Sequence, residues 1–441
     1  MIDLFQDCMN KAKAAGAAKD WPVAERWYGE AVRLQPTSSA AQRGLGIAFV
    51  SQRKLEGAET AWRAVMKLEP RAADSHYMLG SIMMVQRQLA EAEALLTRAL
   101  ELNPNLAPAA FELGRIAYAQ ENVGRAAQFF QRAIAINPLH VNAIASLMQT
   151  LVDLQLTPDA ITLGKESLAR LQAQTALPPV SYNIVHSLLA QAYRYANDLP
   201  AAAACYRAIL ATDPADKVAA HLLAAAEGDV SQDFAKDFAK ASFEALAEGF
   251  DHRLVDQLKY RAPGVLAQVL WEIRADKDGF AAVRDLGCGT GLIGAALGLH
   301  FAIRKLVGVD LSPNMLREAE KRGLYGELIC DDVVSAMYKR DDRFDLIMAA
   351  DVLVYVGALE KTFEQASRVL NAGGMFVFTV EASATADLEL ESTGHYRHGK
   401  AYIARLAEAQ GFEIARLTED VIRTELNRDI AGLYVYLTKS N

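Results

Sequence analysis

The stretch Val283-Arg-Asp-Leu-Gly-Cys-Gly-Thr-Gly-Leu-Ile-Gly294 decides the fold of the C-terminal half of this 441-residue chain. A short strand is expected over 281–286, followed by Gly287, Gly289 and Gly291 and then by a helix. Glycine has no Cβ, so such a turn can adopt unusual dihedral angles and can approach a ligand closely. The N–H groups at the start of the next helix suit a polar ligand group. By itself the pattern also fits a dinucleotide-binding turn.

Further strands follow this turn at regular intervals, and most of them end in acidic residues. The strand 306–310 ends in Asp310, at a distance from Gly291 that lets a carboxylate accept hydrogen bonds from ribose hydroxyls. Three more apolar runs complete the pattern: 328–330 before Asp331 and Asp332, 344–349 before Asp351, and 375–380. The order of these features predicts a parallel α/β sheet that binds a nucleoside.

This ordered set resembles the class I S-adenosylmethionine-dependent methyltransferases over roughly residues 241–441. The resemblance implies a Rossmann-like α/β domain with a seven-stranded, mostly parallel sheet and S-adenosylmethionine as the cofactor. Two alternatives remain open, a dinucleotide dehydrogenase and an α/β core that binds no nucleotide. The entry segment, with Phe250, Asp251, His252 and Tyr260-Arg-Ala-Pro263, resembles a bacterial family of methyltransferases fused to tetratricopeptide repeats.

The resemblance also implies roles for individual residues. Asp310 is expected at the ribose hydroxyls, Asp285 near the ammonium group, and Asp332 at the adenine amino group. Asp331 competes with Asp332, because only one of two adjacent side chains can point inward from a strand end. The full expected cofactor site is Tyr260, Arg261, Asp285, Gly287, Cys288, Gly289, Gly291, Leu292, Asp310, Leu311, Met315, Asp331, Asp332, Val333, Ala350 and Asp351. No metal is expected.

The segment 381–398 is polar and lacks periodicity, which predicts a lid over the cleft. It contains Thr393-Gly-His-Tyr-Arg-His398. His398 matches a histidine of the repeat-fused family and is the first choice for a general base, since imidazole accepts protons near neutral pH. The alternative role for His398 is to cap the helix predicted at 400–409. His395 and Tyr355 are the other catalytic candidates, and Tyr355 can equally pack on the next helix.

Arg423 and Glu425, which lie between the last two predicted strands, are candidates for supporting the predicted lid by an ion pair.

The N-terminal half contains an internal repeat. Pro36, Pro70, Pro104 and Pro138 recur at a constant spacing. Small residues recur in the first helix of each unit and large ones in the second: Leu45-Gly46, Leu79-Gly80 and Leu113-Gly114, then Tyr28, Trp62, Leu96 and Phe130. Both the period and the pattern of sizes resemble the helix–turn–helix units of tetratricopeptide repeats.

The repeat pattern also sets the expected domain boundaries. About six repeats and a capping helix are predicted over 1–227, and the fifth is degenerate because Gly164 stands where a large residue is expected. Extra residues around 172–180 lengthen the next connection. A linker is expected at 228–240, beginning a docking helix over 233–249, and the methyltransferase domain at 241–441.

Composition limits the class of protein. The chain is 52% apolar and 23% charged, with a net charge of −8, which argues against general nucleic-acid binding. Four scattered cysteines predict no disulfide framework or zinc site. No membrane segment or secretory leader is recognised, so a cytoplasmic protein is expected. The oligomeric state stays open.

Three functions fit these observations. The first is methyl transfer to an oxygen or nitrogen nucleophile on a peptide, protein or carrier-bound substrate that the repeats recruit, since repeat solenoids bind extended segments. The second is methylation of a free small metabolite, with the repeats used for assembly or as a spacer. The third is a scaffold without catalysis.

Overall fold

The chain is described by a computed structural model over residues 4–173, 177–230, 235–246, 260–274, 278–340, 342–425 and 428–440. It divides into two compact units, Met1–Ala196 and Asn197–Asn441. Within the described residues, no helix is long and apolar enough to cross a membrane.

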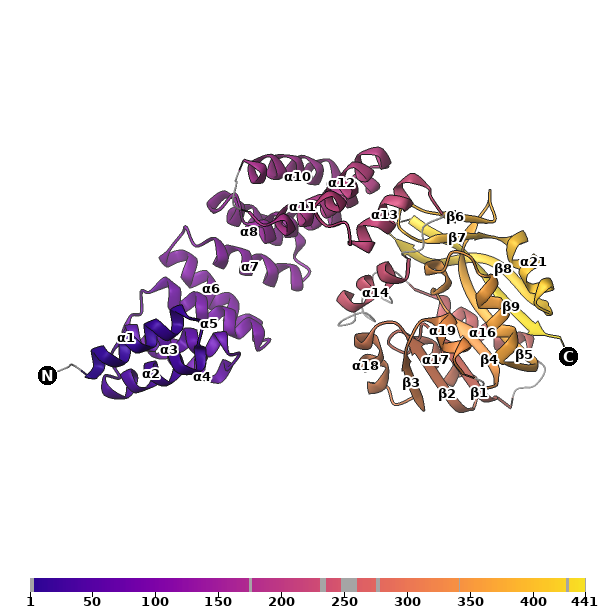
Figure 1. Ribbon diagram of the computed structural model, residues 1–441, viewed down its shortest axis with the longest axis horizontal. Coiled ribbons are helices and arrows are strands. Elements are labelled where there is room, and N and C mark those ends of the chain that lie inside the picture. Colours follow the sequence, from indigo (N-terminus) through magenta and orange to yellow (C-terminus); the bar gives the residue numbers. More distant parts are fainter. Residues whose placement is uncertain are drawn as a thin grey trace. The chain divides into compact units, whose positions relative to one another are not determined.

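The first unit consists of helices that pair in sequence order (Figure 1). The pairs are α1 (Leu4–Ala17) with α2 (Trp21–Leu34), α3 (Ser39–Ser51) with α4 (Leu55–Leu68), α5 (Ala73–Val85) with α6 (Leu89–Leu102), α7 (Ala107–Ala119) with α8 (Val123–Ile136), and α9 (Val141–Asp153) with α10 (Thr157–Gln172), followed by α11 (Pro179–Tyr195). The predicted all-helical repeat solenoid is confirmed.

The turn inside each helix pair repeats the same backbone conformation. One non-glycine residue with a φ of +57° to +62° follows the first helix of every pair, at the same spacing as the prolines: Lys19, Arg53, Arg87, Glu121 and Gln155. The next such residue, Asn197 (φ +58°), comes later than this spacing predicts. The delay matches the extra residues expected around 172–180.

Small residues in the first helix make room for large residues in the second. A Cβ added to Gly46 would lie 2.6 Å from the Trp62 ring, and one added to Gly114 would lie 2.5 Å from Phe130. Both large side chains are 2% exposed. The large side chain of the second helix therefore fits into the space left by the glycine of the first helix, at the same place in each unit. These large side chains belong to the hydrophobic core.

The fifth pair reverses this arrangement. Met148 stands on α9 where the other units have glycine, and Gly164 stands on α10 where they have a large residue. A Cβ on Gly164 would lie 2.7 Å from Met148 Cε. The fifth unit keeps the volume of the contact by exchanging the two sizes, so its degeneracy is only apparent.

The second unit begins with helices that continue the repeat pattern. These are α12 (Leu199–Thr212) and α13 (Lys217–Glu227), followed by α14 (Ala235–Leu246). The sequence pattern ended the solenoid at 227, whereas the compact units divide before α12. The difference arises because Ala224 and Ala225 of α13 share a small core with Leu390 and Tyr396 of the α/β domain.

The rest of the second unit is a three-layer α/β domain. Its described strands form one nine-stranded sheet in the order β3-β2-β1-β4-β5-β7-β6, and β9 joins β5 to β8. The strands are β1 (Phe280–Leu286), β2 (Ile303–Asp310), β3 (Glu327–Cys330), β4 (Phe344–Ala349), β5 (Leu370–Ser383), β6 (Leu388–Leu390), β7 (Tyr396–Gly399), β8 (Phe412–Glu425) and β9 (Arg428–Lys439).

Helices cover both faces of the sheet. Apolar residues of α16 (Ala262–Ile273) and α17 (Leu292–Gly298) pack on one face. On the other face lie α19 (Val333–Tyr338), α20 (Glu360–Val369) and α21 (Lys400–Ala409). The remaining elements are α18 (Pro313–Lys321) and the short 3₁₀ helix η2 (Leu353–Tyr355).

The predicted mostly parallel sheet is confirmed, with the seven expected strands in the order β3-β2-β1-β4-β5-β9-β8 and two further strands, β6 and β7. The segment 381–398, expected to be irregular, is not. Residues 388–399 instead form the antiparallel pair β6–β7, and β7 runs parallel to the end of β5. The hairpin is ordered by burial of Leu390 and Tyr396 against α13. Because α13 lies far from this hairpin in the sequence, their contact produces no local periodicity from which the hairpin could be predicted.

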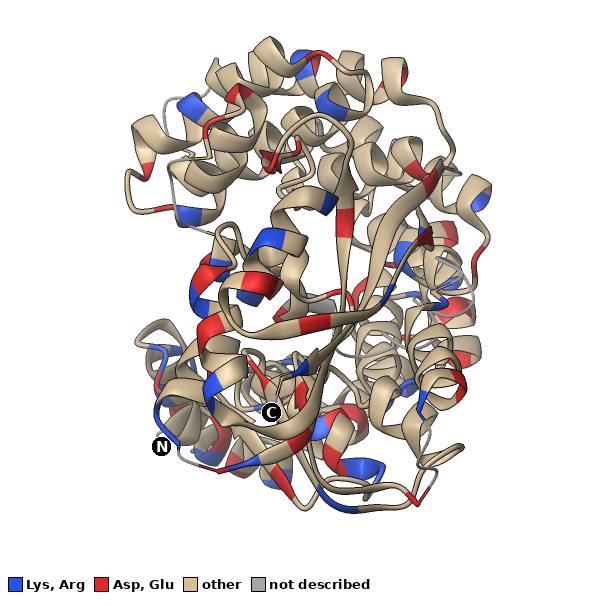
Figure 2. Cartoon of the chain, turned by 90° about the vertical axis from the view of Figure 1, so that its right-hand side faces the viewer, with Lys and Arg blue, Asp and Glu red and all other residues tan. Residues whose placement is uncertain are grey.

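Charged residues of both signs are interspersed along the helices and strands, as Figure 2 shows. Many form ion pairs between neighbouring repeat helices; Arg43, for example, contacts both Glu69 and Asp74.

Candidate active site

The glycine-rich loop connects β1 to α17 and contains three residues in left-handed conformations. The φ angles of Gly287, Gly289 and Gly291 are +65°, +53° and +94°. A Cβ on Gly287 would also lie 2.3 Å from Val352. Glycine is therefore required at 287 both by the backbone and by the close approach of the segment after β4.

Asp310 holds this loop against the end of β2. Its Oδ2 accepts a 2.9 Å hydrogen bond from Gly289 N–H, and its Oδ1 accepts a 2.8 Å bond from Ser312 N–H. The side chain is buried, and burial raises the pKa of Asp310. Each carboxylate oxygen has a second lone pair, so further donors such as hydroxyl groups can still bind.

Asp285 is fully buried two positions before the loop. Its Oδ2 accepts a 2.7 Å hydrogen bond from the Tyr325 hydroxyl, whereas its Oδ1 has no partner among the described residues. Burial raises the pKa of Asp285 to about 7. A buried carboxylate oxygen without a donor is costly, and an ammonium group is the kind of ligand that would satisfy it.

The two acids after β3 are both engaged within the chain. Asp332 caps α19 by accepting from Val334 and Ser335 N–H, and it also pairs with Lys236 of α14. Burial raises the pKa of Asp332, but Lys236 and the cap outweigh it, so the pKa is lowered. Asp331 lies 2.6 Å from Lys339 Nζ. The choice between the two acids as an adenine contact therefore stays a prediction.

The other expected cofactor residues surround these acids. Burial raises the pKa of Tyr260 well above its usual value; Asp351 adds to this rise and Arg423 opposes it. Arg261 N–H donates to Ile422 O at 3.3 Å at the start of α16. Cys288, Met315 and Val333 are buried, and Leu292, Leu311 and Ala350 are half-buried. Phe250, Asp251 and His252 lie outside the described residues.

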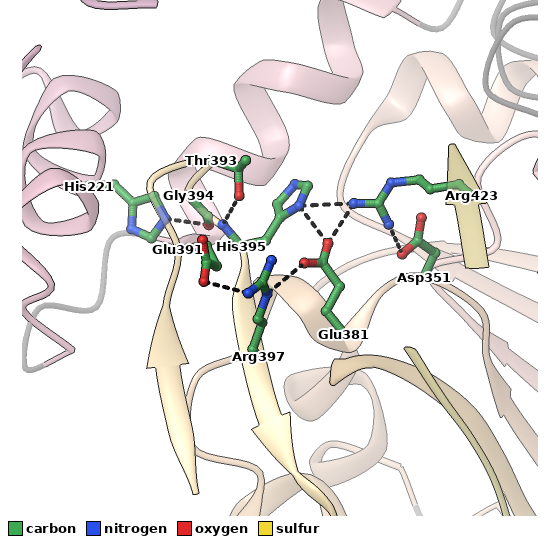
Figure 3. A network of polar contacts seen from close by, with 9 residues as sticks. All are labelled: His221, Asp351, Glu381, Glu391, Thr393, Gly394, His395, Arg397 and Arg423. Carbon is green, nitrogen blue, oxygen red and sulfur yellow. Dashed lines mark hydrogen bonds and ion pairs between the residues drawn. The ribbon is translucent and has the colours of Figure 1, made fainter. Parts of the chain in front are cut away.

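A polar network lies at the carboxyl ends of β4 and β5 (Figure 3). Arg423 of β8 reaches Asp351 through Nη1 at 2.7 Å and Glu381 through Nη2 at 2.5 Å. His395 Nδ1 lies 2.9 Å from the same Glu381 oxygen, and Arg423 Nη2 lies 3.1 Å from His395 Nδ1. Arg397 lies 2.7 Å from Glu391 and 3.7 Å from Glu381.

Glu381 fixes the tautomer of His395. Burial alone would raise the pKa of Glu381, but the contacts with His395 and Arg423 lower it by more, so its pKa is about 2. Glu381 is therefore ionised at neutral pH. An ionised carboxylate only accepts hydrogen bonds, so Nδ1–H is the donor to Glu381, and in the neutral ring the lone pair is then on Nε2. The guanidinium of Arg423 also only donates, so its 3.1 Å approach to Nδ1 is a contact and not a hydrogen bond. Figure 3 shows Nε2 directed away from Glu381 and Arg423. The His395 side chain keeps 14% of its surface exposed.

His398 lies on the opposite side of β7, because successive side chains of a strand point to opposite faces. It is fully buried, its Nε2–H donates to Gly357 O at 2.8 Å, and burial lowers its pKa. This environment corrects the expectation that His398 is the first choice for a base. It does not cap α21 through its side chain either, since no such bond is present at the cap.

Tyr355 lies between α14 and the network. Its ring centroid is 5.0 Å from His395, 5.3 Å from Phe243 and 6.3 Å from Phe238. Tyr355 thus borders His395 and packs on α14, which precedes it in the chain, whereas the expected packing partner is the next helix; its contact with a substrate stays a prediction.

Sequence reasoning missed Glu381 but singled out Arg423 as a residue that forms an ion pair with the segment 381–398. Arg423 pairs with Asp351 and with Glu381, the first residue of that segment, whereas the side chain of the other candidate, Glu425, lies outside the described residues. A signal for Glu381 was available, since this acidic residue follows the apolar run 375–380 directly and so lies near the end of a buried strand.

The fold and site define a class of protein: a tetratricopeptide-repeat unit followed by a class I methyltransferase domain, the class that uses S-adenosylmethionine. Residues 284–378 match a family described as "Methyltransferase domain", and 9–64, 45–107 and 77–140 match "Tetratricopeptide repeat".

Particular relatives can be named for each half. The chain is 30% identical over 155 residues to a malonyl-[acyl-carrier protein] O-methyltransferase of Herminiimonas arsenicoxydans, covering 35% of this chain and 52% of the relative. It is 31% identical over 101 residues to a ubiquinone biosynthesis O-methyltransferase of Coxiella burnetii, covering 22% and 42%. The chain thus spans about half the length of the curated relatives it matches.

Among solved structures, the tetratricopeptide-repeat protein YrrB is similar with 18% identity and a TM-score of 0.36, over 44% of this chain and 96% of that protein.

Proposed function

We propose that this protein transfers a methyl group from S-adenosylmethionine to an oxygen or nitrogen nucleophile on a peptide, protein or carrier-bound substrate, and that the repeat unit recruits this substrate. The observation that carries the proposal is the pairing of His395 with Glu381 at 2.9 Å, in a network that reaches Asp351.

The buried acids fit the proposed cofactor. Asp285 offers the ammonium group a buried oxygen that has no partner in the described part of the chain, and Asp310, anchored by two N–H groups, offers its remaining lone pairs to the ribose hydroxyls. When bound, S-adenosylmethionine supplies a methyl group activated by a positively charged sulfur. The residues of this chain have to hold and orient the reactants, and such positioning contributes about 7–11 kcal/mol in favourable cases.

His395 is the proposed general base. Its Nδ1–H is held by ionised Glu381, so its Nε2 has the lone pair needed to accept a proton from the acceptor. This geometry is the base–orienter pair found where a nucleophile must be deprotonated. Arg423 holds Glu381 and Asp351 in place. We therefore expect an acceptor atom that carries a proton, such as a hydroxyl, a phenol or an amine, and Tyr355 borders the site at which it would bind.

Recruitment by the repeats is supported by the combination of domains. Solenoids of stacked helix pairs provide extended surfaces for chain segments. The first relative named above acts, by its name, on a carrier-bound substrate. The second acts in ubiquinone biosynthesis, which keeps the alternative open: methylation of a free small molecule, with the repeats serving assembly.

The experiment uses the full chain, tritium-labelled S-adenosylmethionine and four probes. These are acyl carrier protein bearing a hydroxybenzoyl thioester, the same carrier bearing a malonyl thioester, free hydroxybenzoic acid, and a peptide mixture containing Ser, Tyr and Lys. We expect label on macromolecule-bound acceptors that carry a proton.

The matched variants are His395→Gln and His300→Gln, since both histidines lie in the second unit and His300 contacts only Trp271 and Phe301 among described rings. Loss of a general base lowers the rate by about 10²- to 10⁴-fold, so His395→Gln should lose that much and His300→Gln should keep wild-type activity. Label on the free acid alone would favour the small-metabolite alternative, and full activity of His395→Gln would remove its assigned role.

A further inference from the structure

The last predicted repeat helix makes a buried polar contact with the turn that carries His395. His221 of α13 is fully buried, and its Nε2 lies 2.8 Å from Gly394 O, across 173 positions of sequence. A carbonyl oxygen only accepts, so Nε2 carries the proton and donates. Figure 3 shows His221 at one end of the network and Asp351 at the other.

The backbone hydrogen bonds that close the turn do not use the Gly394 carbonyl, which accepts from His221. Gly394 N–H donates to Glu391 O and Glu391 N–H donates to His395 O, both at 2.8 Å, so the turn is closed by Glu391 and His395. Gly394 has a φ of +88°, and a Cβ there would lie 2.9 Å from Phe238 and 3.2 Å from Leu222. The residue before His395 is therefore enclosed by α13 and α14.

Aromatic rings provide a second connection between the same elements. The His221 ring stacks on Phe238 of α14 at 5.0 Å between centroids. Phe238 lies 6.3 Å from Tyr355, and Tyr355 lies 5.0 Å from His395. The backbone contact and the ring contacts both run from α13 to His395.

We infer that His221 is a positioning residue for catalysis: through the Gly394 carbonyl it holds His395 in the orientation in which Nδ1 meets Glu381. The last helix of the repeat pattern is thus part of the support of the active site. The inference rests on the proposed function for the role of His395, but the placement of His395 can be tested without any substrate.

The experiment reads the tautomer of His395 by nitrogen NMR of the full chain labelled at its eight histidines, with the His395 signals assigned by their loss in His395→Gln. In the wild type, neutral His395 should give the signals of one tautomer, protonated at Nδ1. His221→Phe keeps a ring beside Phe238 and removes the donor, so the signals should move toward the average of both tautomers. His221→Gln, whose amide nitrogen can donate from a similar position, should restore the wild-type signals.

The control is His76→Phe in the first unit, because His76 is also buried and its Nδ1 contacts Ala72 O at 3.0 Å. It should leave the His395 signals unchanged. Thermal unfolding is recorded for each variant. If His221→Phe does not fold, His221→Asn replaces it, since its shorter amide cannot reach the carbonyl.

Folded His221→Phe or His221→Asn with wild-type His395 signals would overturn the inference. Once an acceptor is available, His221→Phe should also lower kcat by about tenfold to hundredfold while the affinity for S-adenosylmethionine stays within twofold, because misplacement of a catalytic group costs on this scale. Failure of methyl transfer in the wild type would instead contradict the proposed function and leave the NMR result readable.

Discussion

Arg423 and Asp351 form a 2.7 Å ion pair across 72 positions of sequence, and this pair joins β8 to the turn after β4. Asp351 has a φ of +57°, and its N–H donates to Thr379 Oγ1 at 2.8 Å. The unusual backbone at Asp351 is therefore fixed from two sides, and its carboxylate is directed at the cation that also holds Glu381.

Removing the cation of this network should destabilise the fold strongly. Arg423→Met leaves Asp351 and Glu381 without their shared partner, and loss of one member of a buried pair costs about 3–5 kcal/mol of unfolding free energy. Arg405→Met is the matched control, because Arg405 and Asp387 are 57% and 58% exposed and exposed pairs contribute about 0–1 kcal/mol. Urea unfolding measures both, and equal losses would contradict the assigned importance of the network.

Gly287 should tolerate a side chain less well than a glycine of the same conformation. Gly287 (φ +65°) faces Val352, whereas Gly323 (φ +64°) has open space within 4 Å. Gly323→Ala should cost about 1–2 kcal/mol for the left-handed backbone, and Gly287→Ala about 1–3 kcal/mol more for overpacking. Thermal unfolding of the two variants separates the cost of the left-handed backbone from the cost of the contact with Val352. A similar loss of stability in both variants would mean that Val352 moves away without cost.

Cofactor binding should release a proton at mildly acid pH. The pKa of Asp285 is raised to about 7 in the fold, so the carboxyl is mostly protonated at pH 6, and an ammonium ligand favours its ionised form. Because the pKa of Asp285 is raised in the fold, this residue makes the folded state more stable at low pH than at high pH. The contribution is lost as the pH rises from the ordinary pKa of an aspartic acid toward about 7.

Calorimetry in two buffers of different ionisation enthalpy measures the released proton. We expect nearly one proton at about pH 6 and little at about pH 8. Tyr325, which donates to Asp285 and whose pKa is raised by burial, stays protonated over this range, and Asp310 faces the same group. Identical heats in both buffers at pH 6 would argue against a contact between Asp285 and the ammonium group.

Asp310→Ala should weaken binding of S-adenosylmethionine at least about tenfold, since a hydrogen bond to a charged group contributes about 1.5–3 kcal/mol. Because Asp310 also anchors Gly289 and Ser312 N–H, the variant should also lose stability. Asp310→Asn keeps a side-chain oxygen for one of these bonds and should lose less of both. Unchanged affinity in Asp310→Ala would contradict the assigned ribose contact.

The exchanged sizes in the fifth repeat should couple in a double-mutant cycle. Gly164→Leu overpacks Met148 and should cost about 1–3 kcal/mol. Adding Met148→Gly restores the small-then-large order of the other units and should recover more than about 0.5 kcal/mol beyond additivity. Strictly additive losses would show that the two positions do not share their space.

Regular spacing made most of the fold predictable from the sequence. The constant spacing of Pro36, Pro70, Pro104 and Pro138 predicted the helix pairs, and the glycine loop followed by Asp310 predicted the parallel sheet, because both are patterns of residue type at fixed spacing along the sequence.

The β6–β7 pair was not predictable, since Tyr396 and Leu390 are buried by α13, which comes far earlier in the chain. The same cause explains His398, whose burial depends on Gly357, and Arg423, whose partners lie on other strands and turns. Contacts between residues so distant in sequence form only when the chain is folded, so no local sequence pattern predicts them.

The central claim is that the acids around the glycine loop form a site for S-adenosylmethionine. Calorimetric titration of the purified full chain with S-adenosylmethionine, run beside NAD, tests it most directly. We expect S-adenosylmethionine to bind in the micromolar range, about −8 kcal/mol at 1 μM, and NAD to give no heat. Binding of NAD, or of neither ligand, would contradict it.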